Sequence, residues 1–554
     1  MNGLPVLISL LGFFLALRFI RRELHPAFYP AVTVSLISVA LCAGGLLGVL
    51  PQAAGALLWL GIACFAGFGV PFLRKDLKNR NGREIRPFVW MMGSFCALCA
   101  LAAVLLRGHF LYSYDDFSHW GLAARVLLSE DRLPLPEDGM MFPSYPPGTA
   151  CFLYFCGKAA GDAGETLLLS QAVMLLSFLM ALQAAPGDGW VGRTLITLLI
   201  PAFWFYTTPL DTLSVDNLLG ASFLAAALLL LKHREETGKH GGELGLILSC
   251  CTLIKNSGLF LSLGMLGLIL IRVFRRKTKL SFGLAGLLLP LLAYLFWRVH
   301  LKLTFTDYGK HFMSLSVYYG TLRSRLGDLG SILSVLLPVA FSPMKNHALW
   351  LLPALLCLGL ALPRAERSRV QPVLRLGALA LLLYDAGILA MYFCSMGIGE
   401  ILAQNGGDFI RYNGTMICAL AGVLLFCGAK TAPAVFREGG AKNRALLVLA
   451  AGFLALALGM NMTRLAPLEE EYRDFPDAWA FADTLRGGEI PKDREVTVLL
   501  NAPEATGYHE YMADYYLRGG RGFRLLGAAS APNEEAGADG TVLLDLREHR
   551  IRMN

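Results

Sequence analysis

Long apolar stretches separated by short polar segments run along the chain from Met1 to Met462. A transmembrane α-helix needs about 20 predominantly apolar residues. Clear candidates begin near Leu4, Val32, Ala54, Phe88, Thr166, Val191, Asn217, Ser281, Ala348, Leu374, Thr415 and Ala445. With the stretch described next, this length rule predicts about 14 crossings. The pattern therefore predicts a mainly α-helical, polytopic transmembrane domain over residues 1–462.

The stretch from Leu244 to Ile271 is too long for one crossing and is interrupted by Lys255-Asn256-Ser257-Gly258. We expect two short helices that meet at this break. A cation within membrane depth is costly unless it has a partner, which makes Lys255 a candidate functional residue. The alternative is a lysine whose long side chain reaches the membrane surface.

Short basic loops set the predicted orientation, because Lys and Arg accumulate on the cytoplasmic side of a membrane. Alternating crossings place five basic loops on that side: 74–86, 232–239, 272–279, 364–375 and 430–444. The opposite side receives residues 108–165, 207–216, 301–330, 395–413 and the C-terminal tail. Residues 331–343 are too short to cross, so we expect an interfacial helix there. We thus predict a multi-pass cell-membrane protein whose large loop 108–165 is extracytoplasmic.

The composition changes near Thr463 to that of a soluble protein. The tail holds 17 acidic and 11 basic residues, a net charge of −6, against +8 for the whole chain, so the membrane part carries about +14. Residues 463–554 are predicted to form a small extracytoplasmic α/β domain that covers the site or binds acceptor. Its expected elements are strands at Val496–Leu500, Phe523–Leu526 and Val542–Leu546, and helices at Pro476–Leu485 and Tyr508–Leu517.

Two classes of ligand fit the composition poorly. No basic patch lies on a soluble domain, which argues against nucleic-acid binding. The 12 cysteines lie mostly inside apolar segments and lack nearby histidines, so we expect small packing residues instead of a zinc site.

The first large outer loop carries adjacent acids, Asp115 and Asp116, followed by His119. Adjacent carboxylates just past a membrane helix are costly to desolvate. If residues 115–128 are helical, Asp115 and His119 share one face, while Asp116 projects about 100° away. One acid would then act as a general base and the other would fix the local structure; the alternative is that both are helix caps.

Further charged residues are expected on the same outer side. Asp216, preceded by Asp211, begins one apolar span, and Arg411-Tyr412 precedes another. Taken singly, these residues would be explained as helix caps or interfacial anchors. Together with Lys255 they place acids and cations at the mouth of an apolar bundle. A lipid-phosphate sugar donor requires this combination, because phosphate binds Lys and Arg and an acceptor hydroxyl needs a base.

These residues resemble a known family. The Asp115-Asp116 pair, His119 and the turn Tyr145-Pro-Pro-Gly148 are similar to the first outer loop of protein O-mannosyltransferases and their bacterial relatives in glycosyltransferase family 39. Those enzymes have an Asp-Glu pair, a nearby His and a His-Pro-Pro-Leu turn. Here the second acid is Asp, the turn begins with Tyr, and His119 follows Asp116 by three positions instead of two. The elements at Lys255 and Arg411 resemble those of bacterial GT-C membrane glycosyltransferases.

The resemblance implies an enzyme with a GT-C-like fold that transfers a sugar, with inversion, from a polyprenyl-phosphate donor. The acceptor is an extracytoplasmic cell-envelope polymer, lipid or protein. The expected catalytic residues are Asp115, Asp116 and His119; the donor phosphate is assigned to Lys255, Arg411 and Tyr412; and supporting roles go to Asp216 and Tyr145. No organic cofactor is expected, and a divalent cation on Asp116 or Asp216 is optional.

Two other functions fit parts of this pattern. A transporter or flippase for lipid-linked saccharides would need paired repeats and midplane helix breaks, and the sequence shows one break. A polysaccharide ligase or polymerase would use the outer-loop cations without needing an Asp base.

Overall fold

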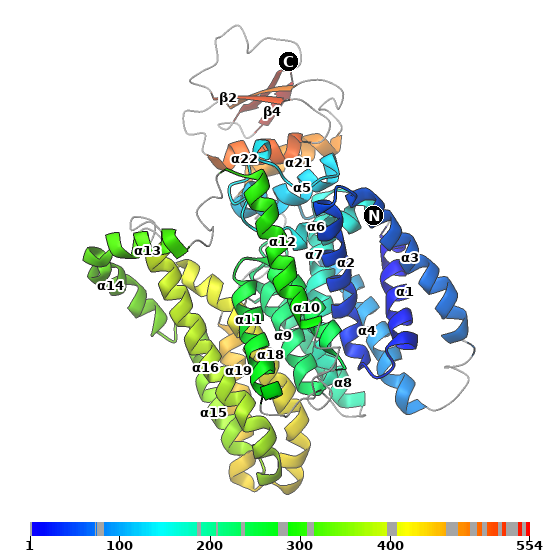
Figure 1. Cartoon of the computed structure of the whole chain (residues 1–554), viewed down its shortest axis with the longest axis vertical. Coiled ribbons are helices and arrows are strands. Elements are labelled where there is room, and N and C mark those ends of the chain that lie inside the picture. The colour runs from blue at the N-terminus through cyan, green and yellow to red at the C-terminus, as the bar shows by residue number, and fades with distance from the viewer. Residues whose placement is uncertain are drawn as a thin grey trace.

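Helices make up most of the regular structure in the computed structural model of the chain, and those of the bundle run roughly along one direction (Figure 1). The structure describes residues 3–72, 74, 82–185, 190–206, 209–233, 239–274, 286–306, 315–395, 407–460, 462, 475–487, 496–500, 507–518, 523–527, 541–545 and 550–553. The bundle contains α1 (Leu4–Ile20), α2 (Tyr29–Leu46), α3 (Leu50–Pro71), α4 (Gly82–Leu105), α7 (Gly164–Leu179), α8 (Trp190–Leu199), α9 (Asp216–Lys232), α10 (Gly241–Ile254), α11 (Gly258–Phe274), α12 (Leu289–Thr304), α15 (Leu351–Ala361), α16 (Arg364–Ser395), α18 (Gly407–Glu438) and α19 (Ala441–Gly459).

Within these ranges, eight helical segments are long and apolar enough to cross a membrane, judged by length and composition. Six further apolar helices are shorter, at 10–17 residues. The protein therefore has the character of an α-helical membrane protein, as the sequence predicts. The number of about 14 crossings stays a prediction, because the shorter helices do not reach the length of a full span on their own.

The long helices divide into an inner and an outer group. In the most apolar 18 residues of Gly164–Ala184, Pro26–Leu46 and Arg411–Glu438, the share of buried residues is 89%, 78% and 72%. In Leu50–Pro71 and Ala441–Gly459 this share is 11% each. The outer helices leave large apolar side chains exposed. Apolar surface of this extent suits contact with lipid chains.

The break at Lys255 is confirmed. Helix α10 ends at Ile254, Lys255 has extended backbone angles (φ −154°, ψ 151°), and α11 begins at Gly258. The backbone N–H of Gly258 donates to the carbonyl of Lys255, which closes a tight turn between the two helices. This turn lies at the same end of the bundle as the segment between α4 and α7, residues 106–163, and we name that end the loop end.

The loop between α4 and α7 is itself structured. It contains a π-helical turn, η3 (Asp116–Trp120), then α5 (Gly121–Glu130), a short 3-10 helix (Pro136–Asp138) and α6 (Gly148–Ala160). Residues 115–128 are thus helical, but the first turn is π-helical, so the side-chain directions expected for an α-helix do not hold there. In η3 the N–H of Gly121 bonds to the carbonyl of Asp116, five residues back.

The C-terminal elements lie beyond the loop end (Figure 1). They are helices α21 (Pro476–Gly487) and α22 (Gly507–Leu517) and strands β1 (Val496–Leu500), β2 (Phe523–Gly527), β3 (Thr541–Asp545) and β4 (Arg550–Met553). The sheet order is β2-β1-β3-β4, with β1 parallel to β2 and β3, and β4 antiparallel to β3. The first three strands start within one residue of their predicted positions, whereas β4 was not predicted. That residues 463–554 form a separate domain stays a prediction.

Several predicted loops fall wholly or partly outside the described residues: 74–86, 207–216, 232–239, 272–279, 301–330 and 395–413. The short segment 331–343 is found as α14 (Leu329–Ala340), next to α13 (Leu315–Ser324), at the side of the bundle (Figure 1). Its 12 residues would extend about 18 Å, too short to span a bilayer. An interfacial position for α14 remains the prediction.

Candidate active site

Lys255 and Asp216 form a buried ion pair at the loop end. Asp216 is the first residue of α9, where a carboxylate is favoured by the positive end of the helix dipole. The Lys255 Nζ lies 2.7 Å from Asp216 Oδ1, and the two side chains are 11% and 5% exposed. Lys255 therefore has a buried partner, Asp216, and this argues against the interpretation of Lys255 as a side chain that reaches the membrane surface.

Arg411 extends this pair to the acidic loop. Its Nη1 donates to Asp115 Oδ2 at 2.8 Å, and its Nε lies 3.7 Å from Asp216 Oδ2. The result is a chain of ion pairs in the order Asp115, Arg411, Asp216, Lys255, which we name the charged cluster. Its four members come from the loop, α18, α9 and the α10–α11 break. Two carboxylates and two cations balance in charge, which lowers the cost of holding them away from water.

Tyr412 lies against both cations. The Lys255 Nζ is 4.7 Å, and the Arg411 Cζ 5.1 Å, from the centre of the Tyr412 ring. These distances fall within cation–π range. The backbone carbonyl of Tyr412 accepts a hydrogen bond from the Tyr384 hydroxyl on α16, at 3.2 Å, which fixes this turn of α18.

Asp116 points away from the charged cluster. Its Oδ1 accepts a hydrogen bond from the backbone N–H of Leu213 at 2.8 Å, and the side chain is fully buried. Burial raises the pKa of Asp116 well above its ordinary value; the Leu213 hydrogen bond opposes the rise, while the neighbouring Asp115 and Asp211 add to it. The two adjacent acids thus have different environments, and Asp115 is the one that faces the cations.

The π-helical turn also directs His119. Gly121 permits this turn, because a Cβ at that position would lie 2.6 Å from the Asp116 carbonyl oxygen. The His119 ring packs against Phe142 and Tyr145, with ring centres 4.9 and 5.6 Å apart, and its Nδ1 lies 2.8 Å from the Ser118 hydroxyl. His119 therefore belongs to an aromatic group, whereas Asp115 belongs to the charged cluster.

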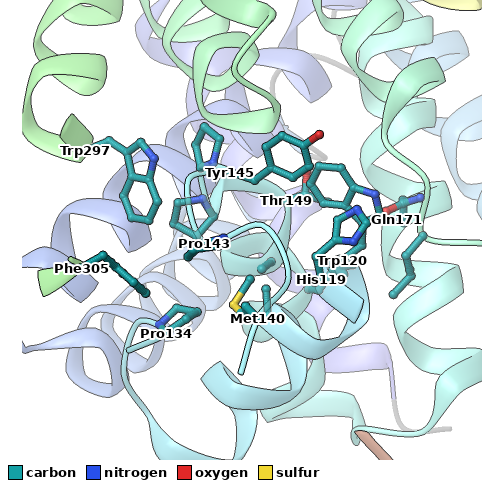
Figure 2. A pocket seen from close by; sticks show the side chains of 16 residues that line it. His119, Trp120, Pro134, Met140, Pro143, Tyr145, Thr149, Gln171, Trp297 and Phe305 are labelled. Atoms are coloured by element: carbon teal, nitrogen blue, oxygen red, sulfur yellow. The ribbon is translucent and has the colours of Figure 1, made fainter. Parts of the chain in front are cut away.

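This aromatic group lines a cavity between the loop and α12 (Figure 2). The cavity holds about 500 Å³ of empty space, part of it open to solvent. Trp120 and Tyr145 form one wall, stacked at 4.9 Å with nearly parallel rings, and Trp297 and Phe305 form the other. We name it the aromatic cavity.

Tyr145 connects the aromatic cavity with the charged cluster. Burial raises the pKa of the Tyr145 phenol well above its ordinary value, with smaller contributions from Tyr412 and Asp216. The Pro-Pro-Gly turn that follows lies directly on α10, since a Cβ on Gly148 would be 2.6 Å from the carbonyl oxygen of Leu253. Only glycine allows the turn to approach the Lys255 break this closely.

The C-terminal helix α22 covers the other side of the acidic loop. The Tyr508 hydroxyl donates to the carbonyl of Tyr112 at 2.9 Å, and the Tyr516 hydroxyl to that of Leu111 at 2.8 Å. Phe117 packs among three rings of this helix: those of Tyr508, Tyr515 and Tyr516, with ring centres 5.5–5.8 Å away. The tail therefore holds the segment that carries Asp115 and Asp116.

A second contact lies at the end of α22. Arg518 donates to Asp138 Oδ1 at 2.7 Å and also pairs with Asp514, while Arg132 pairs with Asp138 from within the loop. This network joins the far end of α22 to the 3-10 helix of the loop. Sequence reasoning named none of these residues, because their partners are up to 380 positions apart.

The structure brings together six of the eight predicted site residues: Asp115, Asp216, Lys255, Arg411 and Tyr412 by direct contacts, and Tyr145 beside them. His119 and Asp116 lie on other sides of the turn. Asp216, predicted only as supporting, forms ion pairs with both cations. Among the described residues no group of three or more His, Cys, Asp and Glu side chains is placed to hold a metal ion, and the dependence on a divalent cation stays untested.

Comparison with known proteins assigns no family and no function to the chain. No protein-family model, no curated protein and no solved structure matches the chain. The function is therefore argued from the site.

Proposed function

We propose that this protein is an integral-membrane glycosyltransferase that moves a sugar from a polyprenyl-phosphate donor to a hydroxyl group of an extracytoplasmic acceptor. The observation that carries the proposal is the charged cluster, in which Lys255 and Arg411 lie within ion-pair distance of one carboxylate at the end of an apolar bundle. A lipid with an anionic headgroup matches both parts: its chain suits the apolar surface and its phosphate suits the paired cations.

Donor binding would exchange one ion pair for another. Arg411 presents a planar fork that binds two phosphate oxygens at once, and Lys255 adds a point charge. Asp115 is the more exposed of the two cluster carboxylates, at 23% against 5% for Asp216. The incoming phosphate therefore displaces Asp115 from Arg411, while Asp216 keeps both cations in place.

The displaced Asp115 then serves as the base. Its carboxylate takes the proton of the acceptor hydroxyl as the acceptor oxygen bonds to the anomeric carbon. The bond from that carbon to the phosphate oxygen breaks in the same step, with inversion, through an oxocarbenium-like state. The bonding electron pair leaves with the polyprenyl phosphate, whose growing negative charge Lys255 and Arg411 stabilise. Phosphate needs no general acid to depart.

The orientation belongs to the same proposal. The basic loops mark one end of the bundle as cytoplasmic, so the loop end faces outward. The charged cluster, the aromatic cavity and the C-terminal elements would then all be extracytoplasmic, with residues 463–554 as a small α/β domain on the acidic loop. About 14 crossings would complete the transmembrane bundle.

The test uses the native cell with the gene removed and then restored. We expect mass spectrometry of envelope polymers, lipids and glycoproteins to show one sugar missing without the gene, restored by the wild-type chain and not by Asp115→Asn. Asp162→Asn is the matched control, because Asp162 lies in the same loop and also pairs with an arginine, Arg125, but at the surface. A transporter would instead be indicated if Asp115→Asn restored the sugar, or if reconstituted protein moved lipid across vesicles without forming glycosidic bonds.

A further inference from the structure

Two side chains that line the aromatic cavity carry polar atoms for which no hydrogen-bond partner is found within the described part of the chain. They are Thr149 Oγ1, on a side chain 4% exposed, and Gln171 Oε1, on a side chain 8% exposed. Both side chains line the cavity (Figure 2). A buried acceptor left unpaired is costly, so two of them on side chains that line one cavity point to a ligand that donates hydrogen bonds.

The orientation of Gln171 is fixed by the protein. Its Nε2 donates to the backbone carbonyls of Thr212 and Ser214, both at 3.1 Å. The two donor positions of the amide are thus in use, and the carbonyl oxygen keeps its capacity to accept a hydrogen bond. Gln171 is therefore held as an acceptor, which selects a hydroxyl or N–H donor.

Aromatic faces form the rest of the cavity. Figure 2 shows the Trp120 and Tyr145 rings on one side and Trp297 on the other. Trp297 is 4% exposed, and its Nε1 donates to the Ser144 carbonyl at 3.2 Å, so the indole ring is held in one orientation.

We infer that the aromatic cavity binds a sugar ring, with its C–H faces against Trp120, Tyr145 and Trp297 and its hydroxyls on Gln171 and Thr149. A sugar ring combines apolar faces with hydroxyl groups at its edge, and both parts have a counterpart here. An isoprenoid chain would match the apolar walls but leave the Gln171 and Thr149 oxygens unpaired. This inference rests on the proposed function, because it names the substrate class of the same site.

Two sources of the ring are consistent with this chemistry. The ring is either the sugar of the donor or a sugar of the acceptor, and in the second case the acceptor is a glycan. Tyr145 lines the cavity and is within electrostatic range of Asp216 and Arg411, so either ring would be in the neighbourhood of the donor phosphate. The two sources are separated by measuring sugar binding with and without a polyprenyl phosphate. A free acceptor sugar should bind together with the lipid phosphate. The sugar of the donor should bind only when it is attached to phosphate.

The experiment uses the full-length protein in nanodiscs and saturation-transfer NMR. The probes are methyl glycosides of glucose, galactose, mannose and N-acetylglucosamine, the corresponding sugar 1-phosphates, and farnesyl phosphate as the isoprenoid. We expect at least one glycoside or sugar phosphate to bind. Thr149→Val, which keeps the shape and removes the hydroxyl, should weaken that binding about threefold to tenfold, the usual range for one hydrogen bond.

A matched pair of substitutions tests the aromatic wall. Trp297→Leu should weaken sugar binding about tenfold, and Trp297→Phe, which keeps an aromatic face, should weaken it less. Thr431→Val is the control for Thr149→Val, because Thr431 is also buried but bonds to the Cys427 carbonyl within α18. Size-exclusion profiles and melting temperatures identify any variant that fails to fold, and the Phe variant keeps the test decisive if the Leu variant fails.

Each outcome decides the inference. Loss of sugar binding in the cavity variants, with the control unchanged, supports it. The inference is overturned if all variants bind sugar equally or if no sugar probe binds. It is also overturned if farnesyl phosphate binds, Trp297→Leu weakens that binding, and sugars do not bind. Polyprenyl-phosphate binding that depends on Lys255 is measured in the same samples, so failure of the proposed function is distinguished from failure of the sugar site.

Discussion

The two sides of the acidic turn differ although their carboxylates are adjacent in sequence. Asp115 is partly exposed and pairs with Arg411 at 2.8 Å. Asp116 is fully buried, bonds to the backbone N–H of Leu213, and precedes Phe117, which α22 covers with three tyrosine rings. One side thus carries an ion pair that a ligand is able to replace, and the other is fixed by burial and packing.

This difference separates a chemical role from a structural one. A base must be accessible to its substrate, and in the proposed mechanism Asp115 becomes accessible once Arg411 binds another anion. Burial favours the neutral form of Asp116, and its hydrogen bond joins the turn to the segment before α9. Adjacent acids in a loop therefore need not act as a pair.

The largest expected effect separates these two acids directly. Asp115→Asn should lower the rate of sugar transfer by roughly two to four orders of magnitude, the usual contribution of a general base. Its affinity for polyprenyl phosphate should stay the same or rise, because Asp115 competes with phosphate for Arg411. Transfer assays and lipid-phosphate binding on the same purified samples provide the measurement. If Asp116→Asn abolishes transfer in a folded protein while Asp115→Asn does not, the roles are reversed.

The second prediction concerns the buried pair that supports the Asp115 side. Lys255→Met leaves Asp216 without its closest partner, and removing one member of a buried pair costs about 3–5 kcal/mol. The double variant Lys255→Met with Asp216→Asn should recover most of this stability but not the binding of polyprenyl phosphate. Thermal unfolding in detergent and lipid-phosphate binding test both parts. A single variant as stable as the wild type would show that the pair contributes little.

The third prediction tests the Asp116 side through pH. Because the folded-state pKa of Asp116 is raised, the folded chain binds more protons than the unfolded chain between the ordinary carboxyl value of about 4 and the raised value. Stability should therefore fall, relative to Asp116→Asn, as pH increases through this window, by about 1.4 kcal/mol per unit of pKa shift. Melting temperatures of both proteins from pH 4 upward measure the difference. Parallel pH profiles would contradict the assignment.

The smallest expected effects concern the cover over the turn. Tyr508→Phe and Tyr516→Phe each remove one hydrogen bond to the loop backbone, worth about 0.5–1.5 kcal/mol. Hydrogen exchange at residues 111–117 should become faster in both. Tyr511→Phe is the control on the same helix, because Tyr511 meets Tyr114 ring to ring at 5.8 Å. Unchanged exchange in the first two variants would mean that α22 rests on the loop without holding it.

Parts of the candidate site were predictable because charged residues near apolar helices are conspicuous. Lys255 stands out as a cation inside an apolar stretch, and Arg411 as one just before a span. Their partners were not predictable in the same way. Asp216 has the sequence context of an ordinary helix cap, and it forms ion pairs with both cations only because α9, α10 and α18 pack together. In the sequence, Trp297 and Gln171 look like ordinary residues of apolar helices. Only the position of the loop against these helices makes them part of the cavity wall.

The sequence by itself determined the properties that depend on neighbouring residues. Apolar length predicted a helical membrane protein, the interruption at Lys255 predicted two short helices, and short runs rich in Val, Leu and Phe located three strands of the tail. Only the tertiary structure decided which charges pair: Arg411 with Asp115, 296 positions away, and Lys255 with Asp216, 39 positions away. Spacing along the chain carries no information about such pairs, because the packing of the helices sets which side chains meet. The π-helical turn adds to this, since it directs the Asp115 and Asp116 side chains to different environments.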